Sequence, residues 1–163
     1  MKYTLRKALK SDMSQVLNLI RELATFEKEP RAVVIDVNDL EKDGYGKNPL
    51  FKCMVAEANK KIIGIALMYY RYSTWKGKVL HLEDLIVNHK YRGNGIGAAL
   101  LNEVVKFGKN EGVKRITWEV LDWNTPAIEF YKNRGATIMD EWKVVHLTEQ
   151  GIDNYLAKID ENI

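Results

Sequence analysis

The chain has 163 residues, of which 46% are hydrophobic and 29% are charged, with a formal net charge of +3. This balance excludes a disordered chain and predicts a single globular domain over residues 1–163. Basic residues are dispersed rather than gathered in a stripe, so we expect no nucleic-acid partner. The longest apolar run, Ile62 to Tyr70, is too short to cross a bilayer as a helix. We expect a cytoplasmic protein without a membrane partner.

The first part of the chain predicts a strand, a helix, a loop and a short helix. Apolar residues recur at helical spacing after Ser11 or Asp12, either of which can cap the first helix. Pro30 favours a loop after this helix, and Gly44 is expected to end the second one. The expected ranges are Lys2–Ala8 for the strand, 13–24 for the helix, Glu27–Val34 for the loop and Val37–Asp43 for the short helix.

The middle of the chain predicts an antiparallel meander followed by a long helix. Three strands, Phe51–Glu57, Ile62–Tyr70 and Lys78–Val87, are joined by short turns. Cys53 lies in the first of them and is expected to be a buried small hydrophobe. The helix should begin near Gly95 and end at Gly112, because its apolar residues share one face.

The last part of the chain predicts further strands alternating with helices. Lys114–Leu121 is expected to form a strand, and Thr125 and Pro126 to begin a helix, with the Thr125 hydroxyl as its cap. Strands at Ala136–Met139 and Trp142–Leu147 and a helix from Thr148 should follow. The order predicts an α/β (α+β) fold with a mixed, mostly antiparallel sheet. One parallel β-α-β crossover is expected, with helices on both faces of the sheet.

A glycine-rich segment before the long helix carries the strongest functional signal. Glycine lets a ligand approach the backbone, and a helix start offers unpaired N–H groups and the positive end of a dipole. An arginine can add a bidentate phosphate contact. We therefore expect a phosphate-bearing ligand to bind the segment Arg92, Gly93, Asn94, Gly95, Ile96, Gly97 and Ala98.

Three phosphate ligands compete for this segment. A nucleotide-binding Walker A loop would need Gly-Lys-Ser/Thr after the last glycine, but Ala98 and Ala99 stand there. A dinucleotide fingerprint is formally met, with Glu119 at a suitable distance, but residues 88–92 separate the strand from the first glycine. The diphosphate of coenzyme A is the third candidate.

Arg92, Gly95 and Gly97 match the signature of the GNAT acetyltransferases, and the surrounding element order resembles that superfamily. Within it, the chain is similar to the spermidine/spermine N-acetyltransferase family, which includes enzymes that acetylate thialysine and related diamino acids. The resemblance implies transfer of an acetyl group from acetyl-CoA to the primary amine of a small diamine, polyamine or diamino acid. It spans nearly the whole chain and is carried by the segments Glu41–Gly46, Leu82–Val87, Tyr91–Gly97 and Trp123–Ala136.

The resemblance also implies roles for individual residues. Tyr131 would protonate the departing thiolate, and Glu83 would bind the amine and remove its proton through water. Leu85, Ile86 and Val87 would bond the pantetheine arm, with Asn124, Thr125, Pro126 and Ala127 also at the coenzyme. The amine would be bound by Phe26, Glu27, Trp75, Glu83, Asp84 and Trp142.

Structural roles stay open beside these catalytic ones. Tyr131 could pack on the core, Asn124 could cap a helix, and core packing is the favoured reading of each tryptophan taken alone. Since adjacent strand residues point to opposite faces, only one of Glu83 and Asp84 can face a given pocket unless a bulge intervenes.

Departures from the polyamine enzymes leave the amine open. Phe26 stands where the family often has tyrosine, Ser73 replaces an acid, and Glu119 stands where an apolar residue is common. A protein N-terminal or lysine acetyltransferase and a non-catalytic acyl-CoA sensor remain alternatives. The resemblance further implies a homodimer in which the segment around Trp142 completes the partner's pocket. His81, His89 and His146 lack metal-ligand spacing, so no metal is expected.

Overall fold

The computed structural model describes residues 1–160 and divides the chain into two compact units, Met1–Leu121 and the part from Asp122 onward. The larger unit contains the whole sheet, and the smaller one contains two helices. The single domain expected over residues 1–163 stays a prediction, and residues 161–163 lie outside the described range.

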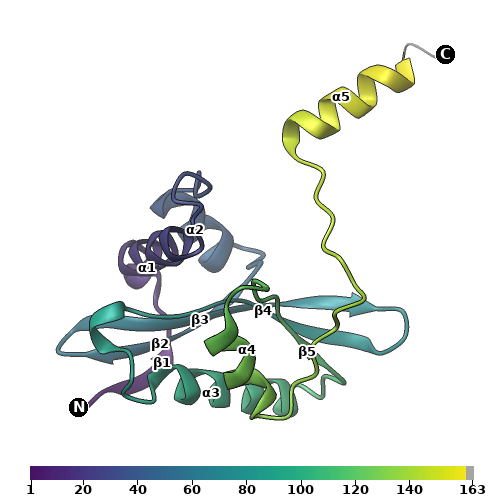
Figure 1. Ribbon diagram of the computed structural model, residues 1–163. Coiled ribbons are helices and arrows are strands. Elements are labelled where there is room, and N and C mark those ends of the chain that lie inside the picture. The colour runs from purple at the N-terminus through teal and green to yellow at the C-terminus, as the bar shows by residue number, and fades with distance from the viewer. Residues whose placement is uncertain (161–163) are drawn as a thin grey trace. The chain divides into compact units, whose positions relative to one another are not determined.

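The first unit is built on a five-stranded sheet in the order β1-β2-β3-β4-β5 (Figure 1). The strands are β1 (Thr4–Lys7), β2 (Lys52–Ala58), β3 (Lys61–Ser73), β4 (Gly77–Val87) and β5 (Ile116–Thr117). The first four are antiparallel neighbours, whereas β5 runs parallel to β4. The predicted meander and single parallel crossover are therefore confirmed.

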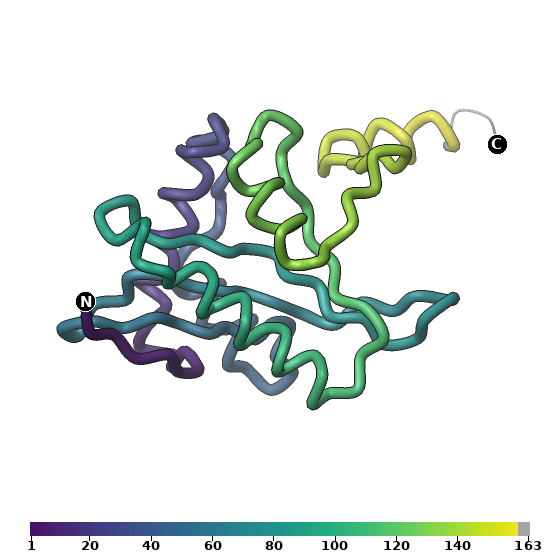
Figure 2. Tube along the Cα trace, turned by 60° about the horizontal axis from the view of Figure 1, so that its bottom comes forward, coloured from purple at the N-terminus to yellow at the C-terminus, as the bar shows by residue number. Residues whose placement is uncertain are grey.

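Helices cover both faces of this sheet, as predicted. The helices α1 (Met13–Phe26) and α2 (Val37–Tyr45) lie on one face, and α3 (Ile96–Asn110) lies on the other (Figure 1). Figure 2 shows α3 crossing the strands, which it contacts at β2, β3 and β4. A Cβ at Gly64 of β3 would lie 3.1 Å from the Leu100 Cδ1 atom of α3, so this glycine permits the close approach of helix and sheet.

The core under α1 unites this helix with the sheet. Its members include the fully buried Met13 and Val16 of α1 and the sheet residues Ile65 and Ile86. Cys53 belongs to the same cluster, and burial raises the pKa of its thiol to about 12. The prediction that Cys53 is a buried hydrophobe is confirmed.

Helix ends differ from the predictions in two places. Asp12 precedes α1, but its carboxylate accepts from Arg6 and from the Leu9 amide rather than from the helix. The helix α2 continues through Gly44 to Tyr45, so the expected stop at Gly44 is wrong. The reason is packing: a Cβ at Gly44 would lie 2.8 Å from Cε2 of the Phe51 ring, so glycine serves a close contact here.

The strand expected at Lys114–Leu121 is mostly wrong, because only β5 forms. Its two pairs join Leu80 to Ile116 and His81 to Thr117. Pairing stops just before the register of β4 shifts against β3, beyond Leu82. A bulge bends its strand, which removes the straight edge that a longer β5 would need.

The second unit contains α4 (Thr125–Lys132) and α5 (Glu149–Asp160). The cap of α4 is the Asn124 carboxamide, which accepts from the Ala127 amide at 3.4 Å, so the predicted Thr125 cap is wrong. The predicted strands Ala136–Met139 and Trp142–Leu147 are also wrong, since the described chain forms no strand between α4 and α5. A strand requires a neighbour for its backbone hydrogen bonds, and sequence alternation cannot supply one.

Candidate active site

The loop before α3 is shaped by two glycines in the left-handed region. Gly93 has φ +79° and Gly95 has φ +75°. A Cβ at either residue would meet no atom within 4 Å, so open space adjoins the loop on that side. Left-handed backbone disfavours L side chains, which explains why glycine occupies both positions.

The start of α3 offers backbone donors beside this space. Gly95 is the N-cap, and no side chain of the described residues caps the helix there. The first amides of a helix have no carbonyl partner within it, and the dipole is positive at this end. This arrangement fits an anionic diphosphate at the segment Gly93–Ala98.

Arg92 and Asn94 hold the loop in shape. The Arg92 Nε donates to the Val87 carbonyl at 2.9 Å, and its guanidinium carbon lies 5.3 Å from the Phe26 ring centroid. Asn94 Nδ2 donates to the carbonyls of Tyr91 and Arg92. The loop is thus tied to the end of β4 and to α1, and direct contact of Arg92 with phosphate stays a prediction.

The last residues of β4 have an open edge. Leu85, Ile86 and Val87 pair with β3 on one side. On the other side, β5 pairs only as far as His81, and no other described strand continues along β4. Such an edge can accept an extended amide-bearing chain, which is what the pantetheine arm of coenzyme A presents.

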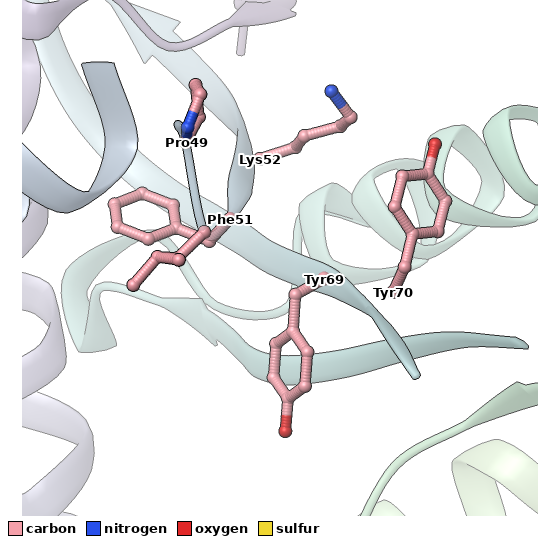
Figure 3. A pocket seen from close by; sticks show the side chains of 6 residues that line it. Pro49, Phe51, Lys52, Tyr69 and Tyr70 are labelled. Atoms are coloured by element: carbon pink, nitrogen blue, oxygen red, sulfur yellow. The ribbon is translucent and has the colours of Figure 1, made fainter. Parts of the chain in front are cut away.

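A bulge in β4 decides where its acidic residues point. Leu82 pairs with Met68 and Asp84 with Leu67, so Glu83 is an extra residue without a partner on β3. Asp84 therefore shares the face of Leu67, which packs in the core beneath α1. Figure 3 shows Tyr69 and Tyr70 pointing to opposite sides of β3, and Tyr69 lies on the Leu67 face. The bulge, which sequence alone left open, is present.

The Glu83 carboxylate is held in its charged form. Its Oε2 lies 3.5 Å from Nε2 of the buried His81. Hydrogen bonding from His81, then from Tyr69, and the charge of Arg71 lower the pKa of Glu83 against the opposing effect of burial. The side chain is 52% exposed, so a ligand can reach it.

Asp84 is shifted in the opposite direction. Burial, followed by the charges of Glu83 and Glu27, raises its pKa to about 6. Glu27 is the C-cap of α1, and desolvation raises its pKa also. Three carboxylates thus interact in one region, which favours a bound cation such as an alkylammonium group.

We expect the variant Asp84→Asn to be more stable than the wild type at neutral pH. The folded pKa of about 6 exceeds the ordinary 3.8, so the ionised Asp84 destabilises the fold. This cost is absent below pH 3.8, grows as pH rises, and is complete above pH 6. The gain should be about 3 kcal/mol at pH 7.5 and below about 1 kcal/mol near pH 4. Urea unfolding at both pH values measures it, with the exposed Asp140→Asn as control; equal gains at both pH values contradict the assignment.

The second unit carries the predicted acid and part of the predicted coenzyme contacts. Tyr131 is buried, and burial raises the pKa of its phenol above the ordinary 10. Its ring lies edge-on to Phe130, with centroids 5.2 Å apart. Asn124, Thr125, Pro126 and Ala127 form the start of α4, where Asn124 is the cap. Their contacts with the coenzyme and the role of Tyr131 as the acid stay predictions.

The predicted aromatic contacts of the amine are at the surface. Trp75 lies in the turn between β3 and β4 and is 79% exposed, and Trp142 is 68% exposed. The favoured reading of these two tryptophans as core residues is therefore wrong. Phe26 ends α1 and is 40% exposed, next to Glu27.

Sequence reasoning missed His81, which contacts Glu83, and the residues that hold the His81 ring. His81, Arg71 and Thr117 come from three strands, and their contacts follow from strand pairing. The available signal was the alternation along β4, which places His81 two residues before Glu83, but the register with β3 and β5 could not be read from it.

A pocket on the first unit shares one residue, Tyr69, with the surroundings of Glu83. It is lined by Pro49, Leu50, Phe51, Lys52, Tyr69 and Tyr70, and none of the predicted site residues borders it (Figure 3). Residues 1–160 contain no group of three or more His, Cys, Asp or Glu side chains able to hold a metal. No helix within this range has the length and apolarity needed to cross a membrane.

Comparison with known proteins bears on this site. The model of the acetyltransferase (GNAT) family matches residues 13–136. Thialysine N-epsilon-acetyltransferase of Mus musculus is 39% identical over 145 residues, covering 84% of this chain and 85% of the relative. A spermidine/spermine N(1)-acetyltransferase-like protein of Homo sapiens is 36% identical, covering 89% of this chain and 22% of the relative. The resemblance to diamine and thialysine acetyltransferases is confirmed.

The fold has a counterpart of known structure. An integron cassette protein from the mobile metagenome of V. cholerae superposes with a TM-score of 0.78 and 23% identity, covering 97% of this chain and 99% of that one. At this identity the likeness shows the fold, and the predicted fold class is confirmed. The glycine loop, the open edge of β4 and these relatives agree: the chain belongs to the acetyltransferase (GNAT) family.

Proposed function

We propose that the chain transfers the acetyl group of acetyl-CoA to a primary amine of a small diamine or diamino acid, of which thialysine is the model. The observation that carries this proposal is the interaction of three carboxylates, Glu83 and Asp84 of β4 and Glu27 at the end of α1, which together would attract a cationic amine. Relatives named for thialysine acetylation share 38–39% of aligned residues with this chain.

The coenzyme would lie along the open edge of β4 and over the glycine loop. The amides of the Gly93–Ala98 segment would bind the diphosphate, and the backbone of Leu85–Val87 would bond the pantetheine arm. Both features belong to the first unit, and only a short segment with the 3-10 turn His89–Tyr91 separates them in the chain. The thioester end would then lie along the strand that also carries Glu83.

Acetyl transfer requires a neutral amine. An alkylammonium has a pKa of about 10, so it arrives protonated and must lose that proton. Glu83 would receive it through a water, while Asp84 and Glu27 hold a second cationic group of the substrate. The amine nitrogen then attacks the thioester carbonyl carbon and forms the carbon–nitrogen bond of the amide. The carbon–sulfur bond breaks and the departing thiolate takes the Tyr131 proton. The second proton that the nitrogen loses passes to solvent, which returns a proton to the Tyr131 phenolate. The raised pKa of Tyr131 keeps the phenol protonated until the thiolate departs.

We also propose that the two compact units form one acetyltransferase domain. The family model runs over residues 13–136 and so crosses the boundary after Leu121. Exposed apolar side chains in the second unit support the expected homodimer, because such groups favour burial against a partner. They include Trp142, Val144, Val145, Leu147, Tyr155 and Leu156.

The two alternatives are favoured less. A non-catalytic acyl-CoA sensor needs the glycine loop. It does not need a half-exposed Glu83 carboxylate that accepts hydrogen bonds from His81 and Tyr69. A protein acetyltransferase would bind an extended peptide, whereas grouped carboxylates suit a short polycation or diamino acid.

A panel of amines tests the proposal. We expect thiol release from acetyl-CoA with thialysine, lysine, ornithine, putrescine or spermidine, and none with glycine, which lacks a second amine. The variant Glu83→Gln should lower kcat/KM by about 100-fold, the usual contribution of a positioned base. Thiol release without preference for diamines, or full activity of Glu83→Gln, contradicts it.

A further inference from the structure

His81 stands apart from the residues that the proposed reaction uses. It is 5% exposed and lies on β4, two residues before the bulge at Glu83. Both ring nitrogens have partners: Nδ1 lies 3.2 Å from Nη1 of Arg71 and 2.9 Å from Oγ1 of Thr117, and Nε2 lies 3.5 Å from Oε2 of Glu83. A buried imidazole held from three strands is a defined arrangement rather than packing alone.

The donor types determine where the His81 proton lies. A guanidinium can only donate hydrogen bonds, so the contact with Arg71 requires Nδ1 to be an acceptor. The Thr117 hydroxyl can donate to the same nitrogen. The single ring proton must then lie on Nε2, which faces Glu83. A second proton on Nδ1 would place a cationic ring against a guanidinium.

We propose that His81 is a positioning residue that carries a proton on Nε2 and donates a hydrogen bond from it to Glu83, so that the carboxylate of the base is held ionised and oriented. The inference rests on the proposed function, in which Glu83 accepts the proton of the amine. The bulge explains why such support is needed, because Glu83 has no register partner on β3 to fix it. Tyr69 on β3 is the second donor to the same carboxylate, and its ring lies 5.1 Å from the His81 ring.

Other charged groups act on the same region and must be separated from His81. On β3 these are Tyr69 and Arg71, which both lower the pKa of Glu83. On β4 the neighbour is Asp84, which itself interacts with Glu27 of α1. Glu119 interacts with Tyr69. Removal of His81 leaves these groups in place, so a change on its removal belongs to the imidazole.

The test begins with measurements that need no turnover. Long-range 15N NMR of the His81 ring should show a proton on Nε2 and none on Nδ1. The Glu83 carboxyl, assigned by its loss in Glu83→Gln, should titrate at higher pH in His81→Leu than in the wild type, as loss of a hydrogen bond to a charged group predicts. The variant His81→Gln, which retains an N–H donor, should restore most of the shift. A Nδ1–H tautomer, or an unchanged Glu83 titration in His81→Leu, overturns the proposal.

The catalytic consequence is read from the acid limb of kcat/KM with thialysine. We expect that limb to move upward in pH in His81→Leu by the same amount as the carboxyl titration, and to return in His81→Gln. If His81→Leu does not fold, Arg71→Met replaces it, since Arg71 is exposed; the Nε2–H population should then fall. If the Glu83 carboxyl titrates at a shifted pH in His81→Leu but the acid limb of kcat/KM does not move, the role of His81 in the reaction is overturned. If no amine is acetylated, the proposed function fails, while the titration still decides whether His81 holds Glu83.

Discussion

Replacing Tyr131 by phenylalanine should lower kcat by about 100-fold while leaving the Kd for coenzyme A unchanged. A positioned acid commonly contributes a factor of this size, equivalent to about 2.7 kcal/mol of barrier. The change removes one oxygen atom and keeps the buried ring, so the packing against Phe130 should survive. Stopped-flow or steady-state thiol release with thialysine gives kcat, and calorimetry gives the Kd.

The matched control for this change is Tyr45→Phe. Tyr45 ends α2, and burial is the main cause that raises the pKa of its phenol to about 12, as burial also raises the pKa of Tyr131. Tyr45 is more exposed than Tyr131 and has no proposed role in the reaction. We expect Tyr45→Phe to keep kcat within about twofold. Loss of turnover below tenfold in Tyr131→Phe, with normal coenzyme binding, would remove Tyr131 as the acid.

The second large effect is expected at the glycine loop. Gly95→Ala should raise the Kd for coenzyme A at least tenfold, or about 1.4 kcal/mol in binding free energy. No protein atom lies within 4 Å of the added Cβ, so the fold has room for it. A diphosphate bound against the loop would occupy that space and would collide with the Cβ. Isothermal calorimetry with coenzyme A measures the effect without any need for an amine.

Backbone strain is separated from ligand contact by Gly112→Ala. Gly112 follows α3, has φ +67° and, like Gly95, would place its Cβ in open space. Both variants should lose about 1–2 kcal/mol of stability, the cost of a left-handed alanine. Only Gly95→Ala should lose affinity. Equal affinity in the two variants would mean that the coenzyme diphosphate does not lie against this loop, and the proposed binding mode would fall.

Local chemistry made several features readable from the sequence. The long helix α3, the antiparallel strands β2–β4 and the glycine loop follow from periodicity and from glycine punctuation, which need no distant partner. The Arg92–Gly97 signature and the segments beside it carried the family, and they sit where expected, between β4 and α3. These features depend on residues close together in the chain.

Register and strand pairing were decided only by the tertiary structure. The bulge at Glu83 arises from the fit of β4 against β3, and it places Asp84 on the α1 face while leaving Glu83 without a partner strand residue. The meeting of His81 with Arg71 and Thr117 depends on the same pairing. The strands expected at Ala136–Met139 and Trp142–Leu147 failed for the converse reason, because no described strand pairs with them. A strand forms its hydrogen bonds with a neighbour that can be far away in the chain. The alternation of apolar and polar residues alone therefore determines neither whether a strand forms nor which of its side chains face the core.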